Sequence, residues 1–215
     1  MLGLPPSDMV LHVLSLVALA AQAMTAALAA GKRSMDWVGV CMLGCITALG
    51  GGTIRDVLLG HYPLVWVQNP SYLLLTAGAA LATILIARSV HRLNTAFRVL
   101  DAIGLVVFTM AGCDVARQID PPLPLLIVVV AGMITGCAGG VLRDILCNDV
   151  PLLFRSELYA SVSVVTGLFY ATAFGLKLNS ELWTALTFVI GLAFRLLAIR
   201  YKWEMPKFVF SGDRR

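Results

Sequence analysis

Two arginine–aspartate pairs are the residues of this sequence best suited to chemistry, because each lies inside an apolar stretch. Arg55-Asp56 and Arg143-Asp144 stand 88 residues apart and end two related segments, GGGTIRD at 50–56 and AGGVLRD at 138–144. Ionisable groups within a membrane-spanning segment are costly unless paired or hydrated, and function is their default explanation. The aspartates would attract cations, and the arginines would act as counter-charges at a gate. All four are candidate pore charges or gate residues; snorkelling to the membrane surface is the alternative.

Glycines directly before each charged pair predict a disturbed helix. The run at 50–52 lies about 20 Å along a helix that starts near residue 37. A glycine costs roughly 1 kcal/mol relative to alanine in a helix, so a run of them predicts a kink or an unwound turn. Carbonyl groups freed there must face protein or water, where they can replace part of a cation's hydration shell. The predicted helix breaks along a pore are Gly50, Gly51, Gly52, Gly139 and Gly140.

Close helix packing is the competing interpretation of these glycines. Gly132, Gly136 and Gly140 follow a GxxxGxxxG pattern, and Gly44 and Gly52 belong to a similar small-residue face. Such faces allow membrane helices to approach each other without lining a pore. Both interpretations can hold for different faces of one helix.

The composition of the chain is that of a membrane protein. Hydrophobic residues make up 59% and charged residues 13%, and the mean hydropathy is +0.88. A soluble domain carries about twice that share of charge. The apolar residues fall in runs of roughly 18 or more, which cross the roughly 30 Å hydrocarbon core as helices. We predict an all-α polytopic membrane protein, with no nucleic-acid partner.

Seven membrane-spanning helices are predicted within one membrane domain, residues 1–215. The first three form one unit at 9–87, the next three a second unit at 99–176, and a seventh helix at 182–199 precedes a basic tail at 200–215. The predicted spans are Met9–Ala30, Trp37–Leu59, Tyr72–Ala87, Val99–Ala116, Leu123–Leu146, Leu158–Leu176 and Leu182–Ile199.

The distribution of basic residues predicts the orientation in the membrane. Seven spans place the termini on opposite sides, and only three of the sixteen Lys and Arg fall on the amino-terminal side: Arg55, Arg117 and Lys177. The positive-inside rule therefore puts the carboxyl terminus in the cytoplasm and the amino terminus outside. We expect the basic tail to touch anionic lipid of the inner leaflet.

The spacing of the two motifs predicts an inverted repeat. An offset of 88 residues contains three spans, an odd number, so the second copy is inserted upside down relative to the first. Two inverted three-helix units with a disturbed helix in each are typical of permeation pathways.

Patterns typical of enzymes are missing from the sequence. It contains no GxSxG, HExxH or P-loop segment and no Cys/His cluster, and its three histidines lie in different segments. We therefore predict neither an enzyme nor a bound cofactor or metal. Among the remaining charges, Asp101 is interpreted as a helix N-cap, and Asp114 as a structural partner of Arg117, three residues later.

The two motifs resemble those of the prokaryotic TRIC-like membrane proteins, relatives of the trimeric intracellular cation channels. The resemblance rests on GGGTIRDVLLG at 50–60, Pro63, Trp66, Asn69-Pro70, GGVLRDIL at 139–146 and VPLLFRSELYA at 150–160. It implies a homotrimer in the bacterial inner membrane, with seven helices and a separate pore in each protomer. It also implies permeation of monovalent cations, chiefly potassium, past the glycine-broken second and fifth helices.

Two departures from the family pattern bear on function. The second glycine triplet is replaced by Ala138-Gly139-Gly140, and Val115 stands where many relatives carry a lysine. Proteins with these motifs are also described as transporters of glycine or other small amino acids. Such a carrier is the alternative function, because inverted repeats with broken helices suit it equally well.

Overall fold

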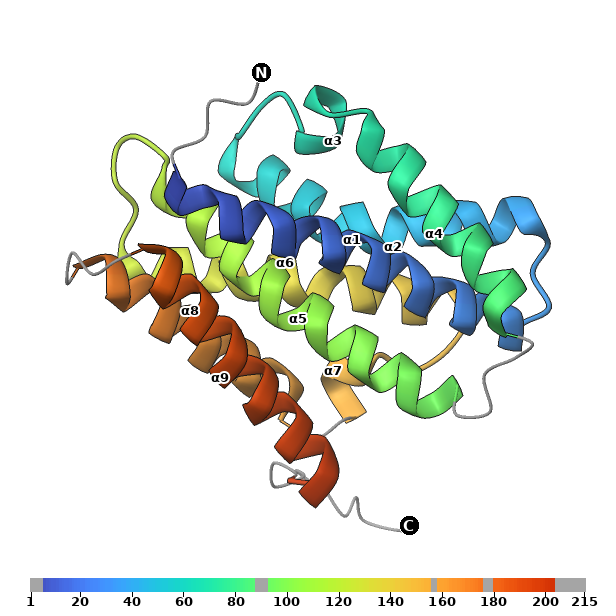
Figure 1. The fold of residues 1–215 in the computed structure, drawn as a ribbon. Helices are drawn as coiled ribbons and strands as arrows, with labels where there is room; N and C mark the ends of the chain where they lie inside the picture. Colours follow the sequence, from blue (N-terminus) through green and yellow to red (C-terminus); the bar gives the residue numbers. More distant parts are fainter. Residues whose placement is uncertain (1–5, 88–92, 156–157, 176–179, 204–215) are drawn as a thin grey trace, which may run out of the picture.

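All regular structure in the computed structural model, which describes residues 6–87, 93–155, 158–175 and 180–203, is helical (Figure 1). This confirms the predicted all-α membrane fold. The helices within these ranges are α1 (Pro6–Lys32), α2 (Trp37–Leu59), α3 (Val65–Gln68), α4 (Ser71–Ala87), α5 (Leu93–Arg117), α6 (Leu125–Leu146), α7 (Leu152–Arg155), α8 (Tyr159–Gly175) and α9 (Ser180–Tyr201).

Seven of these helices coincide with the predicted spans. By length and composition α1, α2, α5, α6 and α9 are able to cross a membrane. The 17 residues of α4 and of α8 each reach only about 26 Å, short of the roughly 30 Å hydrocarbon core. The number of spans therefore stays a prediction. Leu176, where the sixth span was expected to end, and all but residues 200–203 of the basic tail lie outside the described residues.

Two short helices in the connections were not predicted. The segments after α2 and α6 were interpreted as plain breaks, yet short helices form there: α3 starts just after the shared Pro-Leu pair, and α7 starts at the leucine of that pair. The order α2–α3–α4 is thereby repeated as α6–α7–α8.

The ends of α2 and α6 are built alike. Gly60 follows α2 with a φ of 65°, and Asn148 occupies the equivalent place after α6 with a φ of 54°. Glycine and asparagine are the residues that adopt this left-handed conformation most readily. The turn brings the amide N–H of His61 to the carbonyl of Asp56 and that of Asp149 to the carbonyl of Asp144, both at 2.8 Å. Each motif therefore ends in a fixed turn beside its aspartate.

The two motif helices cross at one glycine from each motif. A Cβ atom on Gly51 would overlap the carbonyl oxygen of Thr135, and one on Gly139 would overlap the carbonyl oxygen of Thr47. Thr47 and Thr135 are themselves equivalent residues of the two copies, so the contact is reciprocal. Because residue 51 meets 135 and residue 47 meets 139, α2 and α6 run antiparallel. Arg55 and Arg143 consequently lie at opposite ends of the crossing.

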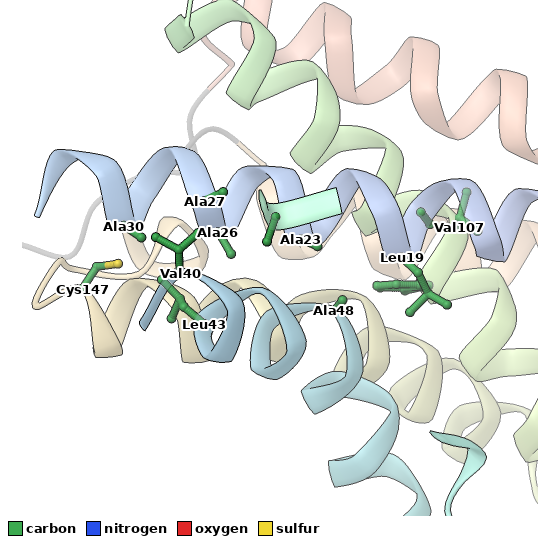
Figure 2. Packing of buried hydrophobic residues seen from close by; sticks show 13 residues of the cluster. Leu19, Ala23, Ala26, Ala27, Ala30, Val40, Leu43, Ala48, Val107 and Cys147 are labelled. Carbon is green, nitrogen blue, oxygen red and sulfur yellow. The ribbon is translucent and has the colours of Figure 1, made fainter. Parts of the chain in front are cut away.

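Small residues also bring α1 close to the motif helices. Figure 2 shows Ala23, Ala26, Ala27 and Ala30 along one face of α1, with Val40 and Leu43 of α2 beside them. All six are buried. Small side chains let membrane helices pack by direct van der Waals contact.

The prediction that the glycines unwind their helices is wrong. α2 is helical without interruption from Trp37 to Leu59, and α6 from Leu125 to Leu146. The glycines instead serve close packing, as the alternative interpretation held: Gly132 and Gly136 lie against the α5 carbonyls of Thr109 and Leu105. Continuous helix keeps backbone groups bonded within an apolar core, which offsets the low helix propensity of glycine. A bend without loss of helix stays a prediction.

The crossing predicts unequal effects of two glycine-to-alanine changes. Gly51→Ala would push a methyl group against backbone that cannot move aside, and we expect a loss of about 1–3 kcal/mol of stability. Gly78→Ala, on α4, is the control, because nothing lies within 4 Å of a Cβ atom there. Thermal unfolding of the purified proteins in detergent measures both. Equal melting temperatures for Gly51→Ala and the wild-type protein would contradict the crossing.

Candidate functional site: two charged clusters and a cavity

The two residues of the first arginine–aspartate pair bond to each other. Arg55 donates to Asp56 Oδ1 from Nε at 2.9 Å and from Nη2 at 2.7 Å, and both side chains are buried. Neighbouring residues of a helix point about 100° apart and do not ordinarily pair, so this pair needs a structural reason. Gly52 provides one: a Cβ atom there would lie 3.7 Å from Arg55 Nη2. The guanidinium folds back over the glycine and so reaches the next residue.

Asp56 keeps one oxygen available. His61 Nδ1 lies 3.2 Å from Asp56 Oδ1, the oxygen that Arg55 already occupies. Asp56 Oδ2 has no hydrogen-bond partner among the described residues, although it is buried. A carboxylate oxygen of this kind is an acceptor for water or a cation.

The second pair belongs to a larger network. Arg143 donates to Asp144 Oδ1 from Nε at 2.9 Å, and from Nη1 to Asp101 Oδ1 at 2.8 Å and Thr25 Oγ1 at 3.0 Å. Its guanidinium carbon also lies 4.5 Å from the centre of the Phe97 ring. Arg143 is fully buried, with 0% exposure. One cation is thus held by groups from α1, α5 and α6.

Asp101 is a gate candidate that sequence reasoning misassigned. It was interpreted as a helix N-cap, but α5 begins at Leu93, so Asp101 lies well inside the helix and pairs with Arg143. The helix start was misplaced because the polar residues before Val99 resemble a loop. Asp114 and Arg117 do form the expected pair, at 2.6 Å.

Two uncharged polar residues of α1 were also missed. Thr25 bonds to Gln22, and Gln22 Nε2 lies 3.5 Å from the carbonyl oxygen of Asp101, in space left open by Gly104. A glutamine and a threonine three residues apart share one face of a helix. Polar groups on one face of an apolar span were the signal available in the sequence.

A cavity of about 310 Å³ opens at the Arg55 end of the bundle. Gly52, Arg55 and Asp56 line it from α2, and Asp114 and Val115 line it from α5. Its remaining walls come from α1, α3, α4, α6 and the α3–α4 connection, with His12 and Trp66 among them. This size suits a few water molecules with an ion, or a small ligand.

A second cavity, of about 480 Å³, lies toward the opposite end. It is bounded by the ends of α1 and α4 and the beginnings of α2 and α5. Phe97 lines this cavity and also stacks on Arg143, so the cavity reaches the edge of the second cluster. Arg143 and its partners therefore stand between this space and the centre of the protein.

The glycines within each motif have different surroundings. Gly51 and Gly139 lie in the helix crossing, and Gly50 lies against Leu142. Gly52 faces the first cavity, while a Cβ atom on Gly140 would lie 3.1 Å from the hydroxyl oxygen of Tyr159 and 3.8 Å from Asp101 Oδ1. Only the last glycine of each motif, Gly52 or Gly140, therefore faces a charged cluster.

Metal binding finds no support within the described ranges. No group of three or more His, Cys, Asp or Glu there is arranged to hold a metal ion. The five cysteines are free thiols. Burial raises the pKa of the Cys147 thiol, just after α6, and the positive charge of Arg143 acts against this shift. The thiol stays protonated at neutral pH and adds no charge to the cluster.

Sequence comparison finds relatives over nearly the whole chain. The sequence model of a family described as Glycine transporter matches twice, at residues 12–88 and 98–174. The UPF0126 inner membrane protein YadS of Escherichia coli strain K12 is 37% identical over 209 residues, which cover 96% of this chain and 100% of that protein. A UPF0126 membrane protein of Vibrio cholerae is 37% identical over 204 residues, covering 94% of this chain and 84% of the relative.

Solved structures with the same fold are cation channels. One, from work on conductance through TRIC cation channels, superposes with a TM-score of 0.84 at 34% identity and covers 94% of this chain and 98% of its own. The TRIC trimeric intracellular cation channel orthologue from Rhodobacter sphaeroides gives 0.85 at 30% identity, over 90% and 99%. These relatives are membrane proteins and channels rather than enzymes. The protein therefore belongs to the prokaryotic TRIC-like family of membrane proteins, whose sequence model bears the description Glycine transporter.

Proposed function

We propose that this protein is a monovalent cation channel, mainly for potassium, that works as a homotrimer in the bacterial inner membrane with a pore inside each protomer. The observation that carries the proposal is the likeness to two solved TRIC cation channels, at 34% and 30% identity over at least 90% of the chain.

The pore would follow the α2–α6 crossing, with α1 and α5 as its other walls. The cavity at the Arg55 end forms its entrance, and Gly52 and Gly140 face its two halves. Asp56 supports this route, because its Oδ2 atom is left without a partner among the described groups. Carboxylate oxygens at the entrance would concentrate cations and disfavour anions.

The Arg143 network would be the closed gate of this pore. Beside Gly52 there is a cavity, whereas the space beside Gly140 is occupied by Tyr159, Asp101 and Arg143. The guanidinium therefore places a positive charge across the path of a cation. Opening requires Arg143 to leave Asp101 and Thr25, and breaking a buried ion pair is strongly unfavourable unless water replaces the lost partner.

An inverted arrangement of the two three-helix units, with α9 as the added seventh helix, belongs to the same proposal. It is supported by the reciprocal contacts of Gly51 and Gly139, by the paired short helices α3 and α7, and by the double match of the family. With the amino terminus outside, as the basic residues predict, the Asp56 entrance faces outward and the Arg143 gate faces the cytoplasm.

A carrier of glycine or another small amino acid is the second candidate, favoured by the description of the matching family. The cavity contains Arg55 for a carboxylate and Asp56 and Asp114 for an ammonium group. A site open at one end and closed at the other also fits alternating access.

Recording from purified protein in planar bilayers under a potassium chloride gradient separates the two functions. We expect discrete currents, because an open pore passes many ions for each gating event. They should reverse near the potassium equilibrium potential, because the proposed pore prefers potassium to chloride. Silent bilayers together with saturable uptake of labelled glycine into proteoliposomes would make the protein a carrier and refute the channel.

Gly52 tests the route of the pore separately from the packing of the helices. Only Arg55 Nη2, the end of a flexible side chain, lies near a Cβ atom at this position, at 3.7 Å, so the helix packing should tolerate Gly52→Val once the guanidinium shifts. Its side chain would narrow the entrance, and we expect unitary conductance to fall by about half or more. Gly78→Val, on the exposed face of α4, is the matched control for a β-branched residue in a helix. Unchanged conductance in a folded Gly52→Val protein would move the pore away from this face.

Asp101→Asn tests the gate. The substitution keeps the shape and one acceptor oxygen but removes the charge that holds Arg143, so the open probability should rise by about fivefold or more. Asp149→Asn is the control, since Asp149 pairs with Arg33 at the surface of the same end and both side chains are over 40% exposed. An open probability equal to that of the wild-type channel would exclude Asp101 from gating.

A further inference from the structure

The seventh long helix brings an arginine into the protein core. Arg195 lies near the carboxyl end of α9, yet its exposure is only 3%. Gly191, one turn earlier on the same face of α9, explains the close approach: a Cβ atom there would lie 2.8 Å from Thr166 Oγ1 of α8 and 3.0 Å from Val106 Cγ1 of α5. Figure 1 shows α9 lying along α8. The side chain of Arg195 therefore points into the bundle.

Tyr159 connects this arginine with the Arg143 network. The guanidinium carbon of Arg195 lies 4.7 Å from the centre of the Tyr159 ring, a cation–π contact. The Tyr159 hydroxyl reaches the same face of Gly140 as Arg143 Nη2 and Asp101 Oδ1. Tyr159 is itself buried, and its hydroxyl oxygen has no hydrogen-bond partner among the described residues. Arg195 of α9 thus contacts Tyr159 of α8, and the Tyr159 hydroxyl shares the space beside Gly140 with Arg143 Nη2.

Arg195 also adds a second buried cation near the carboxylates of the cluster. Asp101 and Asp144 together carry two negative charges, and Arg143 supplies one positive charge. Arg195 is the next buried cation, on the other side of Tyr159. In a medium of low dielectric constant, charges interact over such distances far more strongly than in water.

We propose that Arg195 is a positioning residue for the gate: by stacking on Tyr159 it holds that ring against Gly140 and keeps Arg143 in its closed place. The inference rests on the proposed channel function. It gives the seventh helix a role that neither three-helix unit supplies, because movement of α9 away from α8 would withdraw Arg195, free Tyr159 and release Arg143. The seventh helix is therefore the element through which the gate is controlled.

Arg195→Gln is the central test in bilayer recordings. It removes the cation from the Tyr159 ring, and we expect the open probability to rise about fivefold while unitary conductance stays unchanged. Arg195→Lys, which retains a cation, should restore at least half of the closed-state preference. Arg200→Gln is the matched control, because Arg200 is an exposed arginine on the same helix. A purely structural role would instead lower the yield of folded protein and leave the open probability of the remaining channels unaltered, which would overturn the proposal.

Tyr159 provides a second, independent variant. Tyr159→Phe keeps the ring and should gate like the wild-type channel, whereas Tyr159→Leu should match Arg195→Gln. If the two residues act through each other, combining Tyr159→Leu with Arg195→Gln adds little to either change alone. Fully additive effects would refute a linkage through the ring, and this comparison remains decisive if Arg195→Gln does not fold.

Thiol labelling tests the linkage without any current. In a background whose native cysteines are replaced by serine or alanine, Val141→Cys probes the α6 position that follows Gly140 and is equivalent to Thr53 of the first motif. Thr53→Cys, in the cavity at the other end, is the accessible reference. Arg195→Gln should speed the labelling of Val141→Cys by a charged thiol reagent about fivefold, as mass spectrometry of the intact protein would measure. Faster labelling without currents would refute the channel and keep the linkage. A second outcome is that Asp101→Asn raises the open probability while Arg195→Gln alters neither gating nor labelling. That result would support the channel and refute the linkage between Arg195 and the gate.

Discussion

The close crossing of α2 and α6 sets where both charged motif ends lie in the bundle. Gly51 and Gly139 each face a carbonyl oxygen of the opposite helix, at a distance that leaves no room for a side chain. Because the helices are antiparallel and the contact is reciprocal, the charged ends of the two motifs are directed to opposite ends of the bundle. The same crossing turns Gly52 and Gly140 toward the two charged clusters. One helix crossing, with its two reciprocal contacts, thus places both halves of the candidate site.

The two related motifs have different surroundings because the flanking helices differ. Arg55 has only its neighbour Asp56 as an ion-pair partner in the part of the chain described, and a cavity remains beside it. Arg143 meets Asp101 and Thr25 as well, and these side chains fill the equivalent space. An ionised group in an apolar core must be paired, and Arg143 has more partners than Arg55. The two motifs are similar in sequence and in their helix ends, and they differ in how their charges are paired.

Polar residues of α1 and α9 complete the second cluster from outside the motifs. Thr25 accepts a hydrogen bond from the guanidinium of Arg143, and Arg195 stacks on Tyr159 beside Gly140. Small residues make these approaches possible, since Gly104 leaves room for Gln22 and Gly191 brings α9 against α5 and α8. Glycine in this protein therefore acts mainly by its lack of a side chain, and the helices that contain it remain continuous.

The membrane class, the positions of the long helices and the four motif charges could all be predicted from the sequence. Hydropathy and an internal repeat are recognised from residues that are close together along the chain. The sequence also indicated Gly52 and Gly140 as residues beside charge. The pairing of Arg143 with Asp101 and Thr25 could not be predicted, because these partners lie 42 and 118 positions away in the sequence. The burial of Arg195 could not be predicted either, because it depends on how α9 packs against its neighbouring helices. The predicted helix break failed for the same reason: the propensity of glycine is local, whereas the packing that keeps α2 and α6 helical is supplied by the helix on the other side.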